Sequence, residues 1–365
     1  MRHAGGGCQD ATAERPVAKA LGTRCPMYMP DKIALIRHVH PANHHAHMGK
    51  ASLCDMAKRY PAADLVGIEE HGDFAGQAPP GFAKACGAHA QILTGAESFA
   101  RIGRANATAT TIQHVGVLGP DTSAGRRVAQ GAKVADMSAS VHRAGGAAIF
   151  NHPEWPGSET HPETALSYTI PSADARAFDA VEIFNDRGVT PTGNNPEAAL
   201  GWVERNFFSR GIATALVSGA DDHGNSELAR TPTYTLAIGD GHGTLQEQVV
   251  RAIRGHATYV SKDPAVNVLA DDIDGAIALG ASGVSPPALA HTAHLALDHL
   301  PQGGRAVVVY DGKEVVSESY QGTAWSARYD FVLPSARTTA YVYAKVYDAD
   351  KRLCVVTSPT WLTTP

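Results

Sequence analysis

The chain has 365 residues, which at about 150 residues per domain predicts two domains, or one large barrel with an appended domain. Hydrophobic residues make up 44% and charged residues 18% of the chain, a composition that excludes long disordered or fibrous architectures. The formal net charge of -5 argues against a protein that wraps a nucleic-acid backbone, so we expect no nucleic-acid partner.

No membrane span or secretory signal is visible. No run approaches the roughly 18 apolar residues of a span, and residues 1–22 lack the apolar core of a signal peptide. The cysteines are odd in number, scattered and without a C-x-x-C pair; they are Cys8, Cys25, Cys54, Cys86 and Cys354. This pattern predicts mostly free thiols and a cytoplasmic protein, with a processed secreted form as the alternative.

Histidine is unusually frequent. The chain has 18 histidines, and several fall in one short stretch: His38, His40, His44, His45, His47 and His71. Histidine is the commonest metal ligand in proteins, so this clustering favours a metal site.

In chain order, residues 1–28 have no clear periodicity and are predicted to form a tail. Short apolar runs then predict strands at 33–37, 63–70, 90–97, 110–119, 145–150, 179–184 and 212–219. Longer amphipathic stretches predict helices at 51–60, 124–143, 195–210 and 244–254. Buried strands separated by helices are typical of a parallel sheet with crossovers, here repeated often enough to close a barrel over 29–265.

After Pro264 apolar and polar residues alternate, and turn sequences such as DGK and DADK separate the runs. This pattern predicts antiparallel hairpins, and we expect a small β-sandwich-like domain over 266–365.

Polar side chains that bind metals follow the predicted strands. His38 and His40 form an H-x-H pair, and side chains two apart on a strand project from the same face. Others end or lie on later strands: Glu70, His71, Glu97, His114, His152, Asp221 and His223. In parallel barrels this rim holds the active site, and so many buried charges would be unfavourable without a cation between them. The sequence therefore predicts a metal centre.

The ordered motifs resemble the PHP (polymerase and histidinol phosphatase) family of metal-dependent hydrolases over about residues 33–225. The motifs are RHVH, IEEHGDF, TGAE, GGAAIFNHP, VEIFN and GADDH. The later stretches ARTPTYTLAI, RAIRGHATYVSKDP and SPTWL look like the carbaryl-hydrolase branch of the family, which carries a β domain after the barrel. The resemblance implies an α/β fold, a distorted (β/α)7 TIM-like barrel, with two or three divalent ions (Zn, Mn or Fe).

The resemblance also implies a ligand set. One ion would be held by His38, His40, Glu97 and Asp221, and a second by Glu97, His114 and His152, with Glu97 bridging. A third would use His71, His223 and one histidine of NHHAH, for which His45 is favoured over His44 and His47. The chain departs from the family pattern at Ile36, Pro41 and Glu70, where the family usually has an acidic residue, a threonine and an aspartate.

Other roles are predicted from position. Asp221 and Glu70 are the candidates for handling a proton or orienting water, with plain metal-ligand and hydrogen-bond roles as the alternatives. Asn151 and Arg187 follow strands and are candidates for binding substrate. Trp155 and His161 lie in a rim loop that either caps the pocket or is solvated. The remaining histidines considered are expected to be structural: His242, His256, His291, His294 and His299.

We therefore expect a multinuclear hydrolase that uses a metal-bridging hydroxide to cleave a small-molecule phosphoester. Hydrolysis of a carbamate or carboxylic ester is the alternative, and a non-catalytic metal-binding module is a third. The expected partner is a small-molecule substrate, with no membrane partner.

Overall fold

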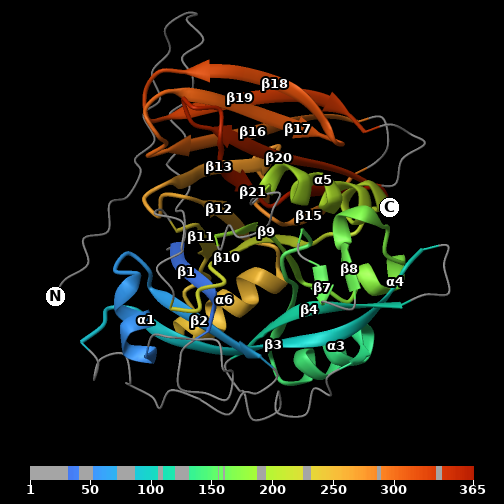
Figure 1. Ribbon diagram of the computed structural model, residues 1–365. Coiled ribbons are helices and arrows are strands. Elements are labelled where there is room, and N and C mark those ends of the chain that lie inside the picture. The colour runs from blue at the N-terminus through green and yellow to red at the C-terminus, as the bar shows by residue number, and fades with distance from the viewer. Residues whose placement is uncertain are drawn as a thin grey trace, which may run out of the picture.

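The computed structural model describes residues 32–40, 52–71, 87–105, 110–119, 131–154, 156–158, 161–186, 195–224, 232–285, 289–333 and 339–365. Over these residues the protein is a mixed α/β structure in which strands outnumber helices. In Figure 1 the strands coloured orange to red, from the C-terminal part, lie above those coloured blue to green.

Strands occur at all seven places predicted for the first part of the chain. They are β1 (Lys32–Val39), β2 (Leu65–His71), β3 (Gln91–Gly103), β4 (Thr110–Leu118), β6 (Ala147–Phe150), β9 (Ala180–Asn185) and β10 (Ala215–Gly219). They lie in the order β10-β9-β6-β4-β3-β2-β1, and β1 continues to β11 (Tyr234–Ile238) and β12 (Thr258–Ser261). The pairs β1–β2, β2–β3, β6–β9 and β9–β10 are parallel, as expected for strands joined by crossovers.

The expectation of a wholly parallel sheet is wrong, because β4 runs antiparallel to both β3 and β6. Only residues 104–109 separate β3 from β4, which is too short for a helical crossover. β3 is also longer than predicted, and β5 (Ala132–Lys133) pairs with its second half. β1 and β11 are antiparallel as well.

The described helices of seven or more residues are α1 (Leu53–Arg59), α3 (Val134–Arg143), α5 (Pro196–Asn206) and α6 (Leu245–Arg254). Shorter elements are α4 (Ser172–Ala175), the 3₁₀ turns Ala165–Ser167 and Phe208–Arg210, and the hairpin of β7 (Pro156–Ser158) and β8 (His161–Thr164). Of the helix predicted at 124–143 the structure describes the part from residue 131, and its helical turns begin at Val134.

Helix α6 packs inside the curve of the sheet. Its start is set by a capping box in which Thr244 and Glu247 bond each other's backbone N–H. Val249, Val250 and Ile253 pack in a buried apolar cluster with side chains from β1, β2, β3, β4, β6, β9, β10 and β11. Each such side chain contributes on the order of 1.5–3 kcal/mol. The parallel strands contribute mainly from their N-terminal halves, so this core lies away from their C-terminal ends.

The chain after β10 returns to β1. The N–H of Ala220 donates to the carbonyl of Arg37 at 2.9 Å, and the N–H of Asp222 donates to that of His38 at 3.2 Å. The N–H of His40 donates to the carbonyl of Asp222 at 2.8 Å. The C-terminal ends of β1 and β10 are therefore adjacent, although they are distant in the strand order.

Antiparallel strands dominate the C-terminal part, as predicted. A four-stranded sheet has the order β14-β13-β16-β19. Its strands are β13 (Asn267–Ile273), β14 (Ile277–Ala278), β16 (Ala290–Asp298) and β19 (Trp325–Val332). The other strands are β15 (Ser282–Val284), β17 (Gly304–Tyr310), β18 (Lys313–Tyr320), β20 (Thr339–Tyr347), β21 (Leu353–Thr357) and β22 (Thr360–Thr363). The DGK sequence turns β17 into β18, with positive φ at Asp311 and Gly312.

The two parts of the chain share backbone hydrogen bonds and core. β12 pairs with β21, so the large sheet continues from the first part into the second. One apolar cluster contains Val39 of β1 together with Val268 of β13, Leu295 of β16 and Val342 of β20. The predicted domain boundary at residue 266 is therefore crossed by both the sheet and the core.

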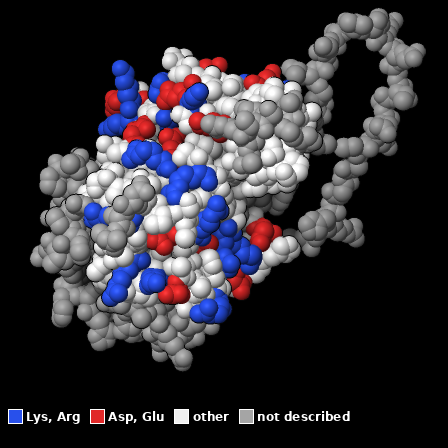
Figure 2. Space-filling model, turned by 90° about the vertical axis from the view of Figure 1, so that its right-hand side faces the viewer, with Lys and Arg blue, Asp and Glu red and all other residues white. Residues whose placement is uncertain are grey.

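The sequence predicts mostly free thiols, and the structure describes two of the five cysteines. Cys354 is a buried free thiol, whereas Cys54 in α1 is disulfide-bonded. The odd and scattered cysteines gave no spacing from which a bond could be predicted. Among the described residues, no helix has the length and apolarity needed to cross a membrane. Figure 2 shows Lys and Arg side chains interspersed with Asp and Glu on one face.

Candidate metal centre

The first candidate ligands lie at an irregularity in β1. Between Ile36 and Val39 the pairing with β2 shifts, because β1 has one residue more than its partner. His38 lies in this bulge with a φ of 63°. The prediction that His38 and His40 share a face assumes regular alternation along the strand, which the bulge interrupts. Their ring centroids are nevertheless only 5.0 Å apart. The bulge is thus part of how this strand presents both imidazoles.

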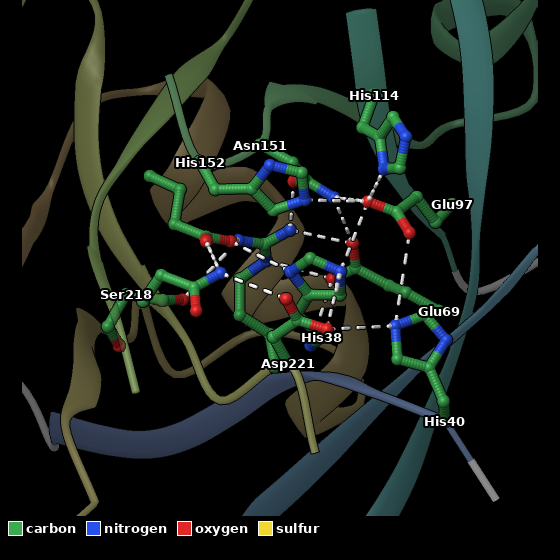
Figure 3. A network of polar contacts seen from close by, with 12 residues as sticks. His38, His40, Glu69, Glu97, His114, Asn151, His152, Ser218 and Asp221 are labelled. Atoms are coloured by element: carbon green, nitrogen blue, oxygen red, sulfur yellow. Dashed lines mark hydrogen bonds and ion pairs between the residues drawn. The ribbon is translucent and has the colours of Figure 1, made fainter. Parts of the chain in front are cut away.

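Glu97 of β3 lies at the centre of the histidines (Figure 3). Its Oε1 is 2.8 Å from Nδ1 of His114 and 3.0 Å from Nε2 of His152. The same oxygen is 3.2 Å from Nε2 of His38, and Oε2 is 3.9 Å from Nε2 of His40. One carboxylate therefore faces histidines on two sides, as a bridge between two cations requires.

Asp221, which follows β10, lies on the other side of His38 and His40. Its Oδ1 is 3.7 Å from Nε2 of His40 and 4.0 Å from Nε2 of His38. His223 stacks on His40 with ring centroids 4.3 Å apart. Two sets of side chains have ligand atoms close enough for one ion each: His38, Glu97 and His152, and His38, His40 and Asp221. These buried nitrogen and oxygen donors fit a divalent metal ion.

Three of these residues have an unfavourable backbone conformation. φ is 63° at His38, 26° at His152 and 48° at Asp221. Each such residue costs of the order of 1–3 kcal/mol, and positions of this kind cluster at functional sites. Positive φ also occurs at non-glycine residues elsewhere, among them His256, Asp274 and His299, so the strain accompanies the ligand geometry and does not by itself mark the site.

Burial and the neighbouring charges shift the pKa values of these groups in opposite directions. Burial lowers the pKa of His38, but Glu97, Glu182 and Asp221 outweigh it and raise that pKa well above 6.5. Burial raises the pKa of Glu97, but His114 and His38 outweigh it and hold that pKa well below 4.5. Without metal, His38 therefore takes up a proton, and a divalent ion would compete with this proton.

The described residues at the cluster carry a surplus of negative charge. Four of their carboxylates are buried, Glu69, Glu97, Glu182 and Asp221, and Arg37 is the permanent cation among them. Burial lowers the pKa of Arg37, yet Glu69 and Glu182 outweigh it and the pKa is raised. Buried carboxylates that lack a cation are strongly unfavourable, so the surplus must be balanced by protons on imidazoles such as His38 or by bound metal ions.

Sequence reasoning missed Arg37, Glu69 and Glu182, all fully buried. A signal was available for Glu69, because it lies two residues before His71 on β2 and residues two apart share a face. Glu182 is the charged residue of β9 and lies between apolar neighbours. Burial tends to raise the pKa of Glu182, but His38 and Arg37 lower it to about 2.

Asn151, predicted to bind substrate, forms hydrogen bonds with other residues of the protein. Its Oδ1 accepts from Nη2 of Arg37 at 2.5 Å, and its Nδ2 donates to Oε1 of Glu97 at 3.1 Å. Several predicted positions lie outside the described residues: His44, His45, His47, Pro41, Trp155 and Arg187. The same holds for the side chains of Glu70, His71 and His161, whose backbones lie in β2 and β8. Ile36 is described and packs in the apolar core.

The histidines predicted to be structural lie away from Glu97. His291 contacts Asp274 through Nδ1 at 2.7 Å and Ser285 through Nε2 at 2.9 Å. His294 and His299 pair with Asp272 and Asp298. His256 is largely buried, which lowers its pKa, and His242 is exposed.

No family model matches the sequence, and no curated protein matches it. Among solved structures the chain is similar to a protein from Bifidobacterium adolescentis described provisionally as a metal-dependent phosphoesterase, with 13% identity, a TM-score of 0.38, and coverage of 55% of this chain and 92% of that one. A Niemann-Pick type C2 protein from the Japanese carpenter ant has 5% identity and a TM-score of 0.17, over 27% of this chain and 89% of that one. Chicken MD-1 complexed with lipid IVa has 14% identity and a TM-score of 0.17, over 29% and 88%. At these TM-scores the likenesses carry no argument about activity.

Proposed function

We propose that this protein is a metal-dependent hydrolase that cleaves a small-molecule phosphoester. The observation that carries the proposal is the position of Glu97, whose two oxygens face different histidines from β1, from β4 and from the residues that follow β1 and β6. One ion would be held by His38, His40, Glu97 and Asp221, and a second by Glu97, His114 and His152.

Divalent ions bound there would lower the pKa of a water molecule between them and polarise the ester under attack. Side chains of the protein would orient the water molecule and the metal ligands. Asp221 would hold a proton of the attacking water, with its Oδ2 fixed by Nδ2 of Asn185 at 3.3 Å. Asn151 would hold Glu97 in position rather than bind substrate, because its amide bonds Arg37 and Glu97.

The finer fold assignment belongs to the same proposal. We infer a distorted (β/α)7 barrel of the PHP type over 29–265 and a β-sandwich-like region over 266–365. The return of the chain from Ala220 to β1 supports closure of the barrel, and the apolar cluster with α6 supports a filled interior. A third ion at His71, His223 and His45, and a proton-handling role for Glu70, rest on the sequence motifs alone.

Carboxylic ester or carbamate hydrolysis is the second candidate, and one observation favours it. Arg37 is the guanidinium that bonds directly to the cluster's carboxylates, and all five of its N–H groups bond protein oxygens. It is therefore not available to bind a phosphate. If the metal ions do not supply enough positive charge for a phosphate, an uncharged ester is the better substrate.

The test is metal analysis of the purified protein followed by parallel assays. The substrates are p-nitrophenyl phosphate, a bis-phosphodiester and a naphthyl carbamate, each with the metal-loaded and the chelator-treated protein. Metal-dependent turnover of a phosphate supports the first proposal, and turnover of the carbamate alone supports the second. Bound metal without turnover of any of the three would leave the non-catalytic module as the better account.

A further inference from the structure

A buried polar network lies beside the candidate ligands, and we call it the Arg37 network. It comprises Arg37, Glu69, Asn151, Glu182 and Asn185, all at most 1% exposed. Nε and Nη2 of Arg37 donate to the two oxygens of Glu69 at 2.8 and 2.6 Å. Figure 3 shows Glu69 and Asn151 beside His38. Because every N–H of Arg37 is bonded, the guanidinium has one fixed orientation.

Glu182 joins this network to a candidate metal ligand. Its Oε2 accepts from Nη1 of Arg37 at 2.5 Å and lies 3.1 Å from Nδ1 of His38. Its Oε1 accepts from Nδ2 of Asn185 at 2.9 Å. Carboxylates face both ring nitrogens of His38, but only Nδ1 forms a hydrogen bond, with Glu182. An ionised carboxylate can only accept, so the proton of a neutral His38 is on Nδ1. Nε2, which lies 3.2 Å from Glu97, then presents its lone pair to an ion.

Two glycines leave the space that the network occupies. A Cβ at Gly116 of β4 would overlap Glu69, Arg37 and Asn151. A Cβ at Gly219 of β10 would overlap the carboxylate of Glu182. Both strands approach so closely that no larger residue fits, so the fold at these points is built around the charged groups.

We propose that Glu182, held by Arg37 and Asn185, is a positioning residue that fixes the tautomer and orientation of His38 and thereby sets the affinity for metal. The proposal rests on the metal-binding part of the proposed function. Partners of this kind orient metal-ligating histidines, and their loss typically lowers metal affinity about 10–100-fold. Asn185 also helps to orient Asp221, because its Nδ2 donates to Oδ2 of Asp221.

The Glu182→Gln variant is a sharp test because the groups around Glu182 are donors on both sides. Arg37 and His38 face Oε2, and Asn185 faces Oε1. The amide NH2 of a glutamine must therefore meet a donor in either orientation. The side chain keeps its size, so changes in packing are small.

The experiment measures zinc and manganese affinity by competition with a chromophoric chelator, for the full-length wild type and variants. We expect Glu182→Gln to weaken affinity about 10–100-fold with an unchanged circular dichroism spectrum. Asp271→Asn is the matched control, since Asp271 is also a buried carboxyl but bonds Thr360 in the C-terminal part. Its metal affinity should equal that of the wild type.

The outcomes separate the two proposals. A wild type that binds neither metal overturns the proposed function. A wild type that binds metal, with Glu182→Gln equal to it in affinity, overturns only the role of Glu182. Should Glu182→Gln not fold, Glu182→Asp keeps the charge but is one methylene too short to reach both Arg37 and His38. Wild-type affinity in a folded Glu182→Asp protein would likewise overturn the role.

Discussion

Among the described residues, buried histidines meet carboxylates in two regions, and the two are built differently. In the C-terminal part, each ring nitrogen of His291 has one partner, Asp274 at 2.7 Å and Ser285 at 2.9 Å. The Asp274 side chain is 45% exposed, so water solvates its charge. In the candidate metal centre, one carboxylate oxygen of Glu97 is shared by three imidazoles.

The order Asp274, His291, Ser285 resembles a catalytic triad only in its residue types. Ser285 is 4% exposed, and its N–H donates to the carbonyl of Thr363 at 2.8 Å. A nucleophile needs access and nearby free N–H donors for the developing oxyanion. The contrast teaches that a buried carboxylate shared by several imidazoles marks the candidate site, whereas one-to-one pairing marks a structural contact.

The largest expected effect is that of Glu97→Ala. Removing the carboxylate shared by both proposed ions should release metal and lower turnover by about 10³-fold or more, since several kcal/mol of charge stabilisation are lost. Metal content and turnover are measured together. Glu314→Ala, at an exposed carboxylate that bonds Lys345, should keep both. A metal-loaded Glu97→Ala protein with unchanged turnover contradicts the assignment.

Metal removal should lower the stability of the protein through the candidate metal centre and not through the region of His291. Ions at about 1,000 times their Kd stabilise the native state by about 4 kcal/mol, so a chelator should lower Tm by roughly 5–10 °C in the wild type. In Asp221→Asn the chelator should lower Tm by less, because one of the two proposed ions loses a ligand while the other keeps its own. Differential scanning calorimetry with and without chelator measures this. A full chelator effect in Asp221→Asn would argue against Asp221 as a ligand.

His291→Ala tests the other side of the comparison. The change removes the hydrogen bonds of His291 with Ser285 and Asp274 and leaves a cavity, and we expect a loss of about 1–3 kcal/mol in the free energy of unfolding. The loss should be the same with and without chelator, and turnover of the folded protein should be unchanged. A loss that depends on metal would mean that the two regions are coupled.

Much of the site's placement could be predicted from the sequence. Apolar runs that end in His, Glu or Asp predict strand ends at His38, Glu97, His152 and Asp221. The strand of Glu97 continues to Gly103, so that end is wrong, but the structure brings the four side chains together. Strand ends can be predicted because buried strands appear as apolar runs and chain reversals as turn residues in the local sequence. The ligand roles themselves stay predictions until metal is measured.

Other features depend on contacts between distant segments and could not be predicted. Arg37 is adjacent to His38 in sequence, but its burial depends on Glu69 and Glu182, which are 32 and 145 residues away. The bulge at His38 requires the register with β2. The disulfide at Cys54 likewise has no local signature.

The smallest expected effect concerns Asp274. Burial tends to raise its pKa, but hydrogen bonds from His291 and Thr292 outweigh this and hold the pKa below 3.8. A carboxyl with a depressed folded pKa stabilises the protein above its unfolded pKa, and that contribution is lost as pH falls through the folded value. The difference in Tm between wild type and Asp274→Asn should therefore be constant from about pH 7 to 5 and shrink below about pH 4. Melting curves of the chelator-treated proteins measure this, and a difference that instead grows toward low pH would show that His291 does not stabilise the ionised carboxylate.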